Sequence, residues 1–417
     1  MRILHTSDWH LGQHFMGKTR LEEHQAFLRW LVEQVQSQAV DAVLVAGDVF
    51  DTGTPPSYAR ELYNDFIVEL QQTGAQLVIL GGNHDSVAML NESRGLLGCL
   101  NVQVIPGVLA DIEHQVLTLY KGDGEPGAVL CAVPFIRARE VMSSESGQSA
   151  SDKQQSLQQA IAAHYQQLFE RAEKLSQNHE AAHGRRLPII GTGHLTTVGA
   201  SSSDSVREIY IGTLDAFPAN AFPPLDYLAL GHIHRPQKVG GHEHMRYCGS
   251  PIALSFDEVG QQKEVLLVDL DENGLSAITP LAVPIFQPLA RVKGNLVELA
   301  TAMQAVAVEH TALSQTDLCQ TKNVWLEVTV AEDDYLTDLQ PRVEQLAEGL
   351  ALEILLVRRQ RSAQQATLTA DARITLSELS PLQVFERRLA AEELAPEREL
   401  ALQSLYQTLL VEREQEA

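Results

Sequence analysis

The chain has 417 residues, of which 44% are apolar and 20% charged, and its formal net charge at pH 7 is −23. This length exceeds one ordinary core and predicts two or three domains. The acidic balance argues against simple electrostatic adhesion to nucleic acid or to an acidic membrane. No segment reaches the roughly 20 apolar residues of a membrane span, and the first residues lack a signal-peptide pattern, so we expect a cytoplasmic protein that does not enter a membrane.

Residues 1–275 alternate apolar strand-like runs with amphipathic helical stretches, the order of an α/β layered domain. The runs that predict strands are Met1–Leu4, Ala42–Val45, Gln76–Leu80, Leu187–Ile190, Tyr227–Leu230, Arg246–Cys248 and Val265–Leu270. The stretches that predict helices are Glu22–Gln36, Tyr58–Leu70 and the long polar segment Asp152–Ser176. The composition of Ser143–Ser151 predicts a flexible loop before the last of these helices.

A smaller domain is predicted over residues 285–361, after a turn at Asp271–Gly274 and a proline-containing linker at Pro280–Pro288. Its elements follow a βαβαβ order. The predicted elements are, in turn, Leu289–Val292, Leu296–Val308, Val324–Val330, Leu339–Leu350 and Leu352–Val357. This domain holds no cluster of residues that bind metals, so we expect it to cap or shape a site that lies elsewhere. Its cationic cluster Arg358, Arg359 and Arg361 is also explained by a solvated strand end.

Residues 374–417 predict two amphipathic helices, Pro381–Ala391 and Glu399–Val411, after the polar tether Ser362–Ala372. Apolar residues recur on one face of each helix at Leu382, Phe385, Leu389, Leu402, Leu405 and Leu409. Such faces need a surface to cover them. That surface is either the chain's own domain or the helices of a partner, and the pattern alone does not decide between the two.

Short polar motifs follow the predicted strands of the first domain. In chain order they are Ser7–His10, Gly47–Asp51, Gly81–Asp85, Gly193–His194 and Gly231–His234. Ligands in open α/β folds gather outside the carboxyl ends of strands, so these residues should converge on one edge. The residue types suited to metal binding are Asp8, His10, Asp48, Asn83, His194, His232 and His234.

These side chains suit two divalent ions held about 3.5–4 Å apart by a shared carboxylate, which polarise a phosphate and lower the pKa of a water. Histidine, aspartate and asparagine ligands without cysteine favour borderline-to-hard ions such as Mn²⁺, with Fe and Zn as alternatives. The remaining histidines are interpreted as surface residues: His5, His14, His24, His114, His164, His179, His183, His242, His244 and His310. Asp85 is expected only to cap the following helix.

The four cysteines, Cys99, Cys131, Cys248 and Cys319, contain no C-x-x-C pair. They therefore predict neither a disulfide framework nor a thiolate zinc site, and we expect them to be small buried apolar residues. The chain also lacks the G-x-x-x-x-G-K-[ST] motif of nucleotide-binding loops. Any ATP dependence would therefore come from a partner.

The motifs resemble those of the calcineurin-type metallophosphoesterase superfamily. Longer runs narrow the resemblance to the bacterial SbcD nuclease family: His5–Gly12, Ala46–Asp51, Asp204–Gly212, Leu228–Pro236, Cys248–Glu258 and Leu379–Phe385. The resemblance covers nearly the whole chain. It implies an α/β fold, namely a calcineurin-like layered sandwich with a smaller capping domain and C-terminal helices.

The resemblance also implies a DNA nuclease of the double-strand-break repair lineage, active in repair, recombination and replication. Family members degrade duplex ends in the 3′→5′ direction and cut single strands and hairpins. They work as a dimer with the SbcC ATPase, whose coiled coils receive the tail helices. Tyr58–Leu70 and Ala88–Leu100 are candidate dimer surfaces, although their apolar positions would serve a core equally well.

Carried over by motif, one Mn²⁺ would be held by Asp8, His10, Asp48 and His234. The other would be held by Asp48, Asn83, His194 and His232. His84 would be the catalytic residue, facing the scissile phosphate and protonating the leaving oxygen.

The chain departs from part of the lineage at Asp51, where archaeal and eukaryotic relatives usually have a histidine. A carboxylate cannot donate a proton as an imidazolium does, so that role is not transferred. We expect Asp51 to orient a neighbouring ligand through a hydrogen bond instead.

Other functions are compatible with parts of this pattern. Protein Ser/Thr phosphatases usually continue the second motif with Arg-Gly and the third with Glu, whereas this chain has Thr52-Gly53 and Asp85. A small-molecule phosphodiesterase, for example one acting on cyclic nucleotides, would share the ligands but have no evident use for the second domain and the tail. A scaffold with a vestigial site is disfavoured because every ligand-type position is chemically intact.

Overall fold

The computed structural model describes residues 1–142, 149–201, 203, 206, 216–314, 322–331 and 338–360. It divides into two compact units. The first comprises Met1–Ala290 with Leu313–Val324, and the second comprises Arg291–Ala312 with the described residues from Trp325 on. The predicted tether and tail helices, with Leu382, Phe385, Leu389, Leu402, Leu405 and Leu409, lie outside the described residues, as does most of Ser143–Ser151.

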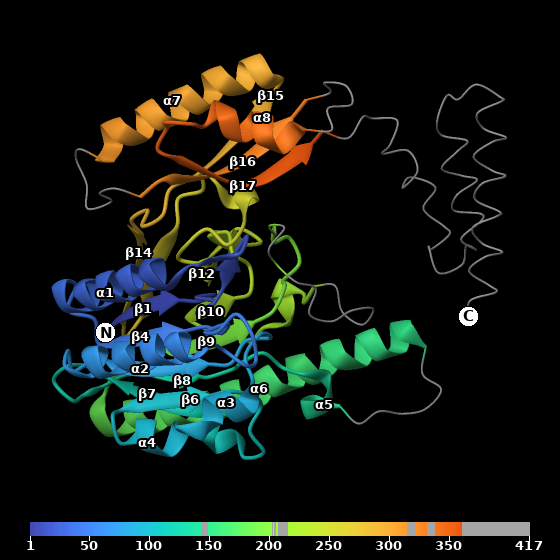
Figure 1. Cartoon of the computed structure of the whole chain (residues 1–417). Helices are drawn as coiled ribbons and strands as arrows, with labels where there is room; N and C mark the ends of the chain where they lie inside the picture. The colour runs from blue at the N-terminus through green and yellow to red at the C-terminus, as the bar shows by residue number, and fades with distance from the viewer. Residues whose placement is uncertain are drawn as a thin grey trace. The chain divides into compact units, whose positions relative to one another are not determined.

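Two six-stranded sheets form the centre of the first unit as described (Figure 1). The first sheet has the order β14 (Gly274–Ala282), β13 (Glu264–Asp271), β1 (Arg2–Thr6), β4 (Ala42–Val45), β5 (Gln76–Leu80) and β6 (Val102–Ile105). The second has the order β11 (Gln237–Val239), β12 (His242–Tyr247), β10 (Tyr227–Gly231), β9 (Ile189–His194), β8 (Pro126–Cys131) and β7 (Val116–Tyr120).

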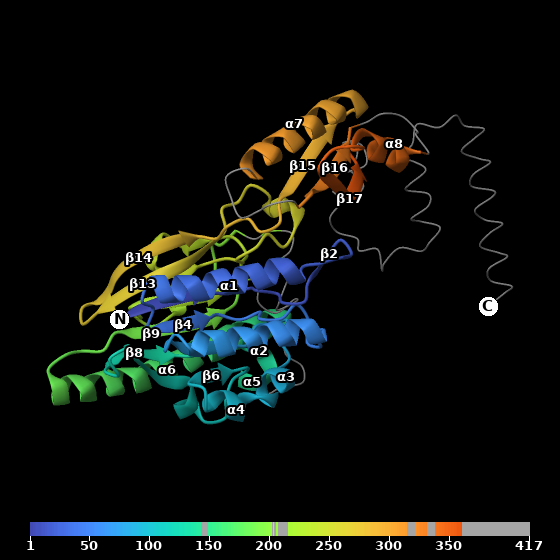
Figure 2. The same ribbon diagram turned by 60° about the vertical axis from the view of Figure 1, so that its left-hand side comes forward.

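Helices cover the outer face of each sheet, which gives a helix–sheet–sheet–helix sandwich (Figures 1 and 2). Phe27 of α1 (Leu21–Ser37) and Phe66 of α2 (Ser57–Gln71) pack in the core outside the first sheet. Tyr165 of α6 (Ala150–His183) packs in the core outside the second. A third core lies between the sheets, where Leu44 and Ile190 are fully buried. The predicted layered α/β fold is confirmed.

Shorter elements complete this unit. They are β2 (His14–Phe15), β3 (Lys18–Thr19), α3 (Val87–Glu92), α4 (Arg94–Gly98) and α5 (Ala138–Val141), with 3₁₀ turns at Ile112–Gln115, Ala219–Ala221 and Phe256–Glu258.

The strand directions bring the polar motifs to one edge. In the first sheet β1, β4, β5 and β6 are parallel, and in the second β8, β9, β10 and β12 are parallel. Backbone hydrogen bonds continue between the segments that follow β1 and β4, from the N–H groups of Asp8 and His10 to the carbonyls of Gly47 and Asp48. The first two motifs therefore run side by side beyond their strands.

The long helix α6 extends further than the predicted Asp152–Ser176. It begins at Ala150, where the Ser149 side chain accepts from the Asp152 N–H and Asp152 accepts in return from the Ser149 backbone. This reciprocal capping satisfies donors at the helix start. The helix ends at Gly184, whose φ of 74° is the left-handed conformation that glycine adopts without strain.

The expected linker at Pro280–Pro288 is partly wrong, because Pro280 lies inside β14. This strand forms the edge of the first sheet and pairs with β13 alone, through an antiparallel ladder that includes Leu266 opposite Pro280. A proline at an edge can turn its missing donor away from the ladder, so the strand tolerates it.

The second unit has the predicted βαβαβ order. Strands β15 (Leu289–Gly294), β16 (Val324–Val330) and β17 (Leu352–Arg359) form one sheet with β16 in the middle, and the helices are α7 (Leu296–Ser314) and α8 (Leu339–Leu346). Glu327 on β16 is buried and pairs with Arg291 at 2.6 Å and Arg358 at 3.1 Å. The described residues of this unit contribute to no group of potential metal ligands.

Burial corrects several expectations from the sequence. His5, His24 and His164 are buried rather than surface residues. Cys131 and Cys248 are buried as expected, whereas Cys99 is exposed and Cys319 lies outside the described residues. None of the described helices combines the length and apolar character needed to cross a membrane.

Candidate metal centre

The predicted ligands meet at the carboxyl edge of the two sheets. Asp8 and His10 follow β1, Asp48 follows β4, and Asn83 follows β5. His194 is the last residue of β9, and His232 and His234 follow β10. The residues therefore converge on one edge, as predicted, and each of the two sheets supplies part of the set.

Three overlapping groups of side chains have their potential ligand atoms within 4.8 Å of one another. They are Asp8, His10 and His234; then His10, Asp48 and His84; and then Asp48, His194 and His232. Asp48 belongs to two of these groups and lies between the other ligands. Its Oδ2 is 3.6 Å from His10 Nε2 and 3.2 Å from His194 Nε2. This is the position expected of a carboxylate shared by two ions.

Asn83 completes the second set. Its Oδ1 lies 2.9 Å from His194 Nε2 and 3.2 Å from His232 Nδ1. Asp8, a member of the first set, accepts hydrogen bonds from the His232 backbone N–H, at 2.9 Å to Oδ1 and 3.1 Å to Oδ2. Ser7 Oγ also donates to Asp8 Oδ2 at 2.6 Å, so the buried Asp8 carboxylate has a set orientation.

Several of these residues have strained backbones. Asp8, His10 and Asp48 have φ values of 54°, 47° and 50°, and His232 has 94°. Positive φ is uncommon for residues other than glycine and costs on the order of 1–3 kcal/mol at each position. Strain at four predicted ligands is typical of a functional site, where the required side-chain positions outweigh the cost of an unfavourable backbone conformation.

Two glycines allow the close approach of these loops. A Cβ on Gly82 would overlap the backbone nitrogen and carboxylate of Asp48, and one on Gly231 would overlap the carbonyl oxygen of Ala46. Any larger residue would therefore push the loops apart. These glycines of the third and last motifs therefore have a steric role.

The electrostatics match a site for cations. Burial alone would lower the pKa of His194, but the Asp48 carboxylate raises it to about 9. Burial would raise the pKa of Asp48, but His194, His10 and His84 hold it well below its usual range. Negative charge in this buried cluster is thus balanced by protons, which divalent cations displace on binding.

The available donor atoms also fit metal ions. The buried nitrogens His10 Nε2 and His232 Nε2 have no hydrogen-bond partner. Buried polar atoms are rarely left in this state, and a bound ion is one explanation. Imidazole, carboxylate and amide donors without thiolate suit borderline-to-hard divalent ions.

Other groups set the orientation of the ligand rings. His194 Nδ1 lies 2.9 Å from the carbonyl oxygen of Ala46. His10 Nδ1 lies 3.3 Å from Asp51 Oδ1, so Asp51 lies beside a predicted ligand, and its orienting role stays a prediction. Such contacts to metal-binding histidines fix the ring and its tautomer.

His84 lies at the edge of the cluster and is less buried than its neighbours. Its backbone N–H donates to Asp48 Oδ1 at 2.9 Å, and its Nδ1 donates to the carbonyl oxygen of Asp51 at 2.6 Å. The ring stands perpendicular to that of His10, with 4.7 Å between centroids. His84 is therefore within reach of the predicted ligands.

Two carboxylates near the site have contacts that the sequence pattern did not predict. Asp85 does not cap the next helix, since Ser86 does so by accepting from the Met89 N–H. Asp85 instead accepts from the N–H groups of Val49, Phe50 and Gly82. The only sequence feature that could have indicated this role is the position of Asp85 at the end of the third motif.

The second is Glu258, whose Oε1 lies 3.4 Å from His234 Nδ1. Burial would raise the pKa of Glu258, but hydrogen bonding to His234 and the charge of Lys263 hold it well below its usual range. Glu258 ends the Cys248–Glu258 run, which the resemblance had already marked. No local pattern distinguishes it from a surface glutamate.

Comparisons with known proteins agree with this geometry. Residues 1–236 match a family described as calcineurin-like phosphoesterase, and residues 285–393 match one described as type 5 capsule protein repressor C-terminal domain. The chain is 53% identical to the SbcD subunit of the nuclease SbcCD of Escherichia coli strain K12 over 410 residues, 98% of each chain.

More distant relatives carry the same name. The chain is 32% identical to the SbcD subunit of Rhodobacter capsulatus, over 85% of this chain and 86% of that protein. It is 29% identical to that of Bacillus subtilis, over 81% of each. With its two sheets, its converging ligands and these full-length relatives, the chain belongs to the SbcD family of calcineurin-like phosphoesterases.

Proposed function

We propose that this chain is the nuclease subunit of an SbcCD-type complex and hydrolyses DNA phosphodiesters with two divalent metal ions. The observation that carries the proposal is the position of Asp48 between the two groups of ligand atoms. A pair of ions at such a site polarises a phosphodiester and lowers the pKa of a water. We further propose Mn²⁺ as the native ion, because the donors are imidazole, carboxylate and amide.

We assign metal binding and proton transfer to different residues of the chain. Asp8, His10, Asp48 and His234 would hold one ion, and Asp48, Asn83, His194 and His232 the other. His84 would stay outside both sets. Because its Nδ1 donates to the Asp51 carbonyl, a proton to be transferred would sit on Nε2, from which it can pass to the leaving oxygen.

Family membership supports the substrate and partners that we propose. We propose 3′→5′ exonuclease activity on duplex ends and endonuclease activity on single strands and hairpins, in DNA repair, recombination and replication in the cytoplasm. The ATPase partner would be SbcC-like, with two copies of this chain in a heterotetramer. The small-molecule alternative is not favoured, because the similarity to nuclease subunits extends over 98% of the chain.

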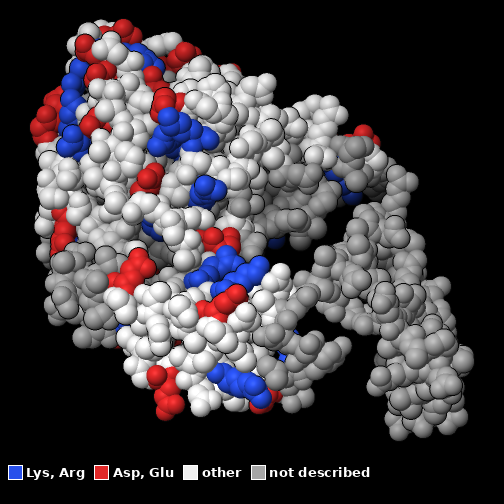
Figure 3. Space-filling model, turned by 90° about the horizontal axis from the view of Figure 1, so that it is seen from above, with Lys and Arg blue, Asp and Glu red and all other residues white. Residues whose placement is uncertain are grey.

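The surface charge supports a role for the partner in holding DNA. The net charge is −23, and on the face shown in Figure 3 lysines and arginines are interspersed with acidic residues. Tight binding to duplex DNA depends mainly on cationic contacts to phosphates. We therefore expect the isolated chain to bind duplex weakly at physiological salt, and nanomolar binding would contradict this.

The test is cleavage of a labelled DNA hairpin with Mn²⁺ by the chain alone, by the chain with its ATPase partner and ATP, and by His84→Ala. Loss of a general acid typically lowers the rate about 10²- to 10⁴-fold, and Mn²⁺ content should stay unchanged. His114→Ala is the matched control, since the His114 side chain is 68% exposed. It should cut like the wild type.

The other outcomes are equally informative. Loss of bound Mn²⁺ in His84→Ala would make His84 a ligand, as its place among the potential ligand atoms allows. Turnover of bis-p-nitrophenyl phosphate without any DNA cleavage, even with the partner, would move the substrate to small molecules and overturn the nuclease proposal.

A further inference from the structure

A buried ion pair lies directly behind His234. Glu258 is 1% exposed and Lys263 is 6% exposed, and Lys263 Nζ lies 2.6 Å from Glu258 Oε2. Removing two charges from water is expensive, and a buried pair is often no more stable than apolar side chains of the same volume. Fold stability alone is therefore a weak explanation for this pair.

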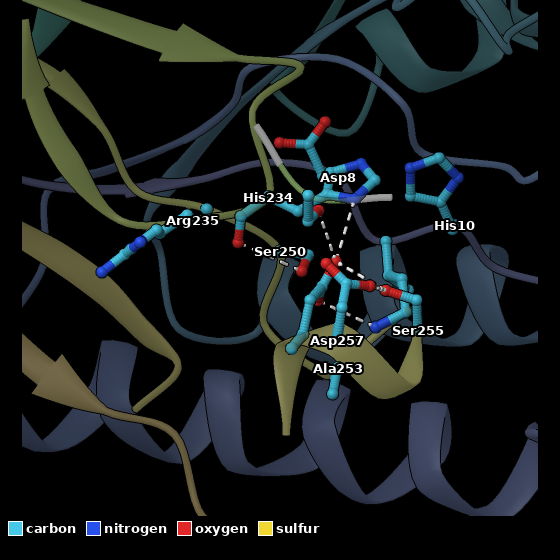
Figure 4. Close-up of polar contacts among 12 residues, drawn as sticks. Asp8, His10, His234, Arg235, Ser250, Ala253, Ser255 and Asp257 are labelled. Carbon is cyan, nitrogen blue, oxygen red and sulfur yellow. Dashed lines mark hydrogen bonds and ion pairs between the residues drawn. The ribbon is translucent and has the colours of Figure 1, made fainter. Parts of the chain in front are cut away.

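Both members of the pair contact His234, at different points. Glu258 Oε1 lies 3.4 Å from the ring nitrogen Nδ1, and Lys263 Nζ donates to the backbone carbonyl at 3.0 Å. Figure 4 shows the ring of His234 turned toward the loop that carries Ser250, Ala253 and Ser255. The side chain and the main chain of this histidine are thus held at the same time.

The Glu258 carboxylate is itself held by several donors. Its Oε2 accepts from the Leu254 N–H at 3.0 Å as well as from Lys263, and its Oε1 accepts from Ser203 Oγ at 2.8 Å. Lys263 also donates to Ser250 Oγ at 3.0 Å. A carboxylate with donors on both oxygens has little freedom to rotate, so its contact with His234 is directional.

The contact between Glu258 and His234 affects which ring nitrogen of His234 carries the proton. An imidazole whose Nδ1–H points at a carboxylate keeps the tautomer with the lone pair on Nε2, which is a form that binds a cation. His10 and His194 have corresponding contacts at Nδ1, with Asp51 and with the Ala46 carbonyl. His234 differs because the carboxylate at its Nδ1, that of Glu258, is buried and is paired with the buried Lys263.

We propose that Glu258 and Lys263 are positioning residues for the metal centre, which hold the His234 ring and backbone so that Nε2 faces the first ion. This inference rests on the proposed function, because it takes His234 as a ligand. It assigns the role to two residues beyond the ligand set. It also explains why a costly buried pair lies at this place.

The test measures Mn²⁺ binding to the full-length chain by calorimetry, with thermal unfolding of the metal-free protein in parallel. Glu258→Gln should weaken one of the two ions about 10- to 100-fold, the usual effect of losing a group that orients a ligand, and leave the other unchanged. Glu23→Gln is the matched control. Glu23 is also a buried carboxylate, paired with Arg20, and has no hydrogen bond or ion pair to a predicted ligand among the described residues.

Glu258→Gln leaves Lys263 buried without its counter-charge and can fail to fold for that reason. The double variant Glu258→Gln/Lys263→Met removes both charges and avoids this problem. It should fold, and it should still lose tight binding of one ion. If Glu23→Gln loses as much thermal stability but keeps both ions, the effect belongs to His234 and not to stability in general.

The outcomes separate the inference from the function on which it rests. Two ions bound with wild-type affinity by a folded Glu258→Gln or double variant would overturn the positioning role and leave the nuclease proposal intact. Failure of the wild-type chain to bind two ions would overturn the two-metal proposal and the positioning role with it. In the metal-free chain, ¹⁵N shifts that place the proton of His234 on Nε2 would contradict the positioning role independently.

Discussion

The backbone N–H of Phe50 donates a 3.0 Å hydrogen bond to the carboxylate of Asp85, 35 residues further along the chain. The same carboxylate accepts from the Val49 N–H at 3.2 Å and the Gly82 N–H at 2.8 Å. One of the joined loops carries Asp48 and the other carries Asn83. Asp85 therefore sets the spacing between two predicted ligands without being one.

Asp85→Ala should destabilise the first unit and weaken metal binding. The substitution leaves three buried N–H groups without an acceptor, at about 1–3 kcal/mol each. We expect a loss of at least about 3 kcal/mol in urea unfolding and reduced Mn²⁺ affinity. Ser86→Ala removes only the cap of the next helix and should cost about 1 kcal/mol. Equal losses in the two variants would contradict this role.

Asp51→Ala should weaken one ion and leave the fold intact. The Asp51 carboxylate lies 3.3 Å from His10 Nδ1, and its side chain is 24% exposed, so little burial is lost. Loss of a group that orients a metal-binding ring, the role predicted for Asp51, should weaken Mn²⁺ binding about 10- to 100-fold in a calorimetric titration. Thr52→Ala at the exposed neighbouring position is the control and should bind both ions normally. If Asp51→Ala binds Mn²⁺ with wild-type affinity, Asp51 is not needed to orient His10, and the predicted role is wrong.

The sequence was sufficient to predict that the candidate ligands converge, because their positions depend on strand order. Strands β4 and β5 have the predicted bounds, and parallel neighbours place whatever follows them at one edge. His194 departs only slightly, since it ends β9 rather than following it. The apolar runs identify the strands, and the polar residues after each run identify the candidate ligands. The strands and the candidate ligands could therefore be recognised from the sequence alone.

The supporting groups could not be recognised in this way. Glu258 contacts His234 from the end of a 3₁₀ turn, and Lys263 contacts it from the position before β13. No sequence pattern marks either residue, and only the three-dimensional path of the chain brings them together. Asp85 resembles a helix cap in sequence because it precedes a helix. Pro280 resembles a linker residue because the sequence does not show which strand forms an edge. Each of these depends on tertiary contacts, which propensity does not encode.

His5 should make stability depend on pH. Burial lowers the pKa of His5 to about 3, from an ordinary value of 6.5. Between these values the unfolded chain binds one more proton than the folded chain, so His5 contributes stability that is present above pH 6.5 and lost as the pH falls. The loss is about 1.4 kcal/mol per pH unit.

The measurement is urea unfolding in EDTA between pH 4.5 and 6. His5→Gln should show a pH slope that is shallower by about one proton, or about 1.4 kcal/mol per pH unit. Tyr227→Phe is the matched control. It removes the hydroxyl 2.8 Å from His5 Nδ1 but keeps the buried imidazole, so it should keep the slope. An unchanged slope in His5→Gln would show that His5 is not the group responsible.

Removal of the tail should separate assembly from chemistry. The predicted apolar faces with Leu382, Phe385 and Leu389 lie beyond Gln360, outside the described residues, whereas every predicted ligand lies within the first unit. Truncation after Gln360 should therefore abolish co-purification with the SbcC-like ATPase and leave two Mn²⁺ ions bound. Leu382→Asp/Phe385→Asp should reproduce the loss, because buried charge disrupts a helix docked in an apolar groove.

Gln383→Asp is the control for this double variant, since position 383 is off the predicted apolar face and its charge would stay in water. It should assemble normally. If the truncated chain still assembles but unfolds at a lower temperature, the helices cover their own domain instead. The two interpretations of this amphipathic tail, which the pattern alone leaves open, thus predict opposite changes in the same pair of measurements.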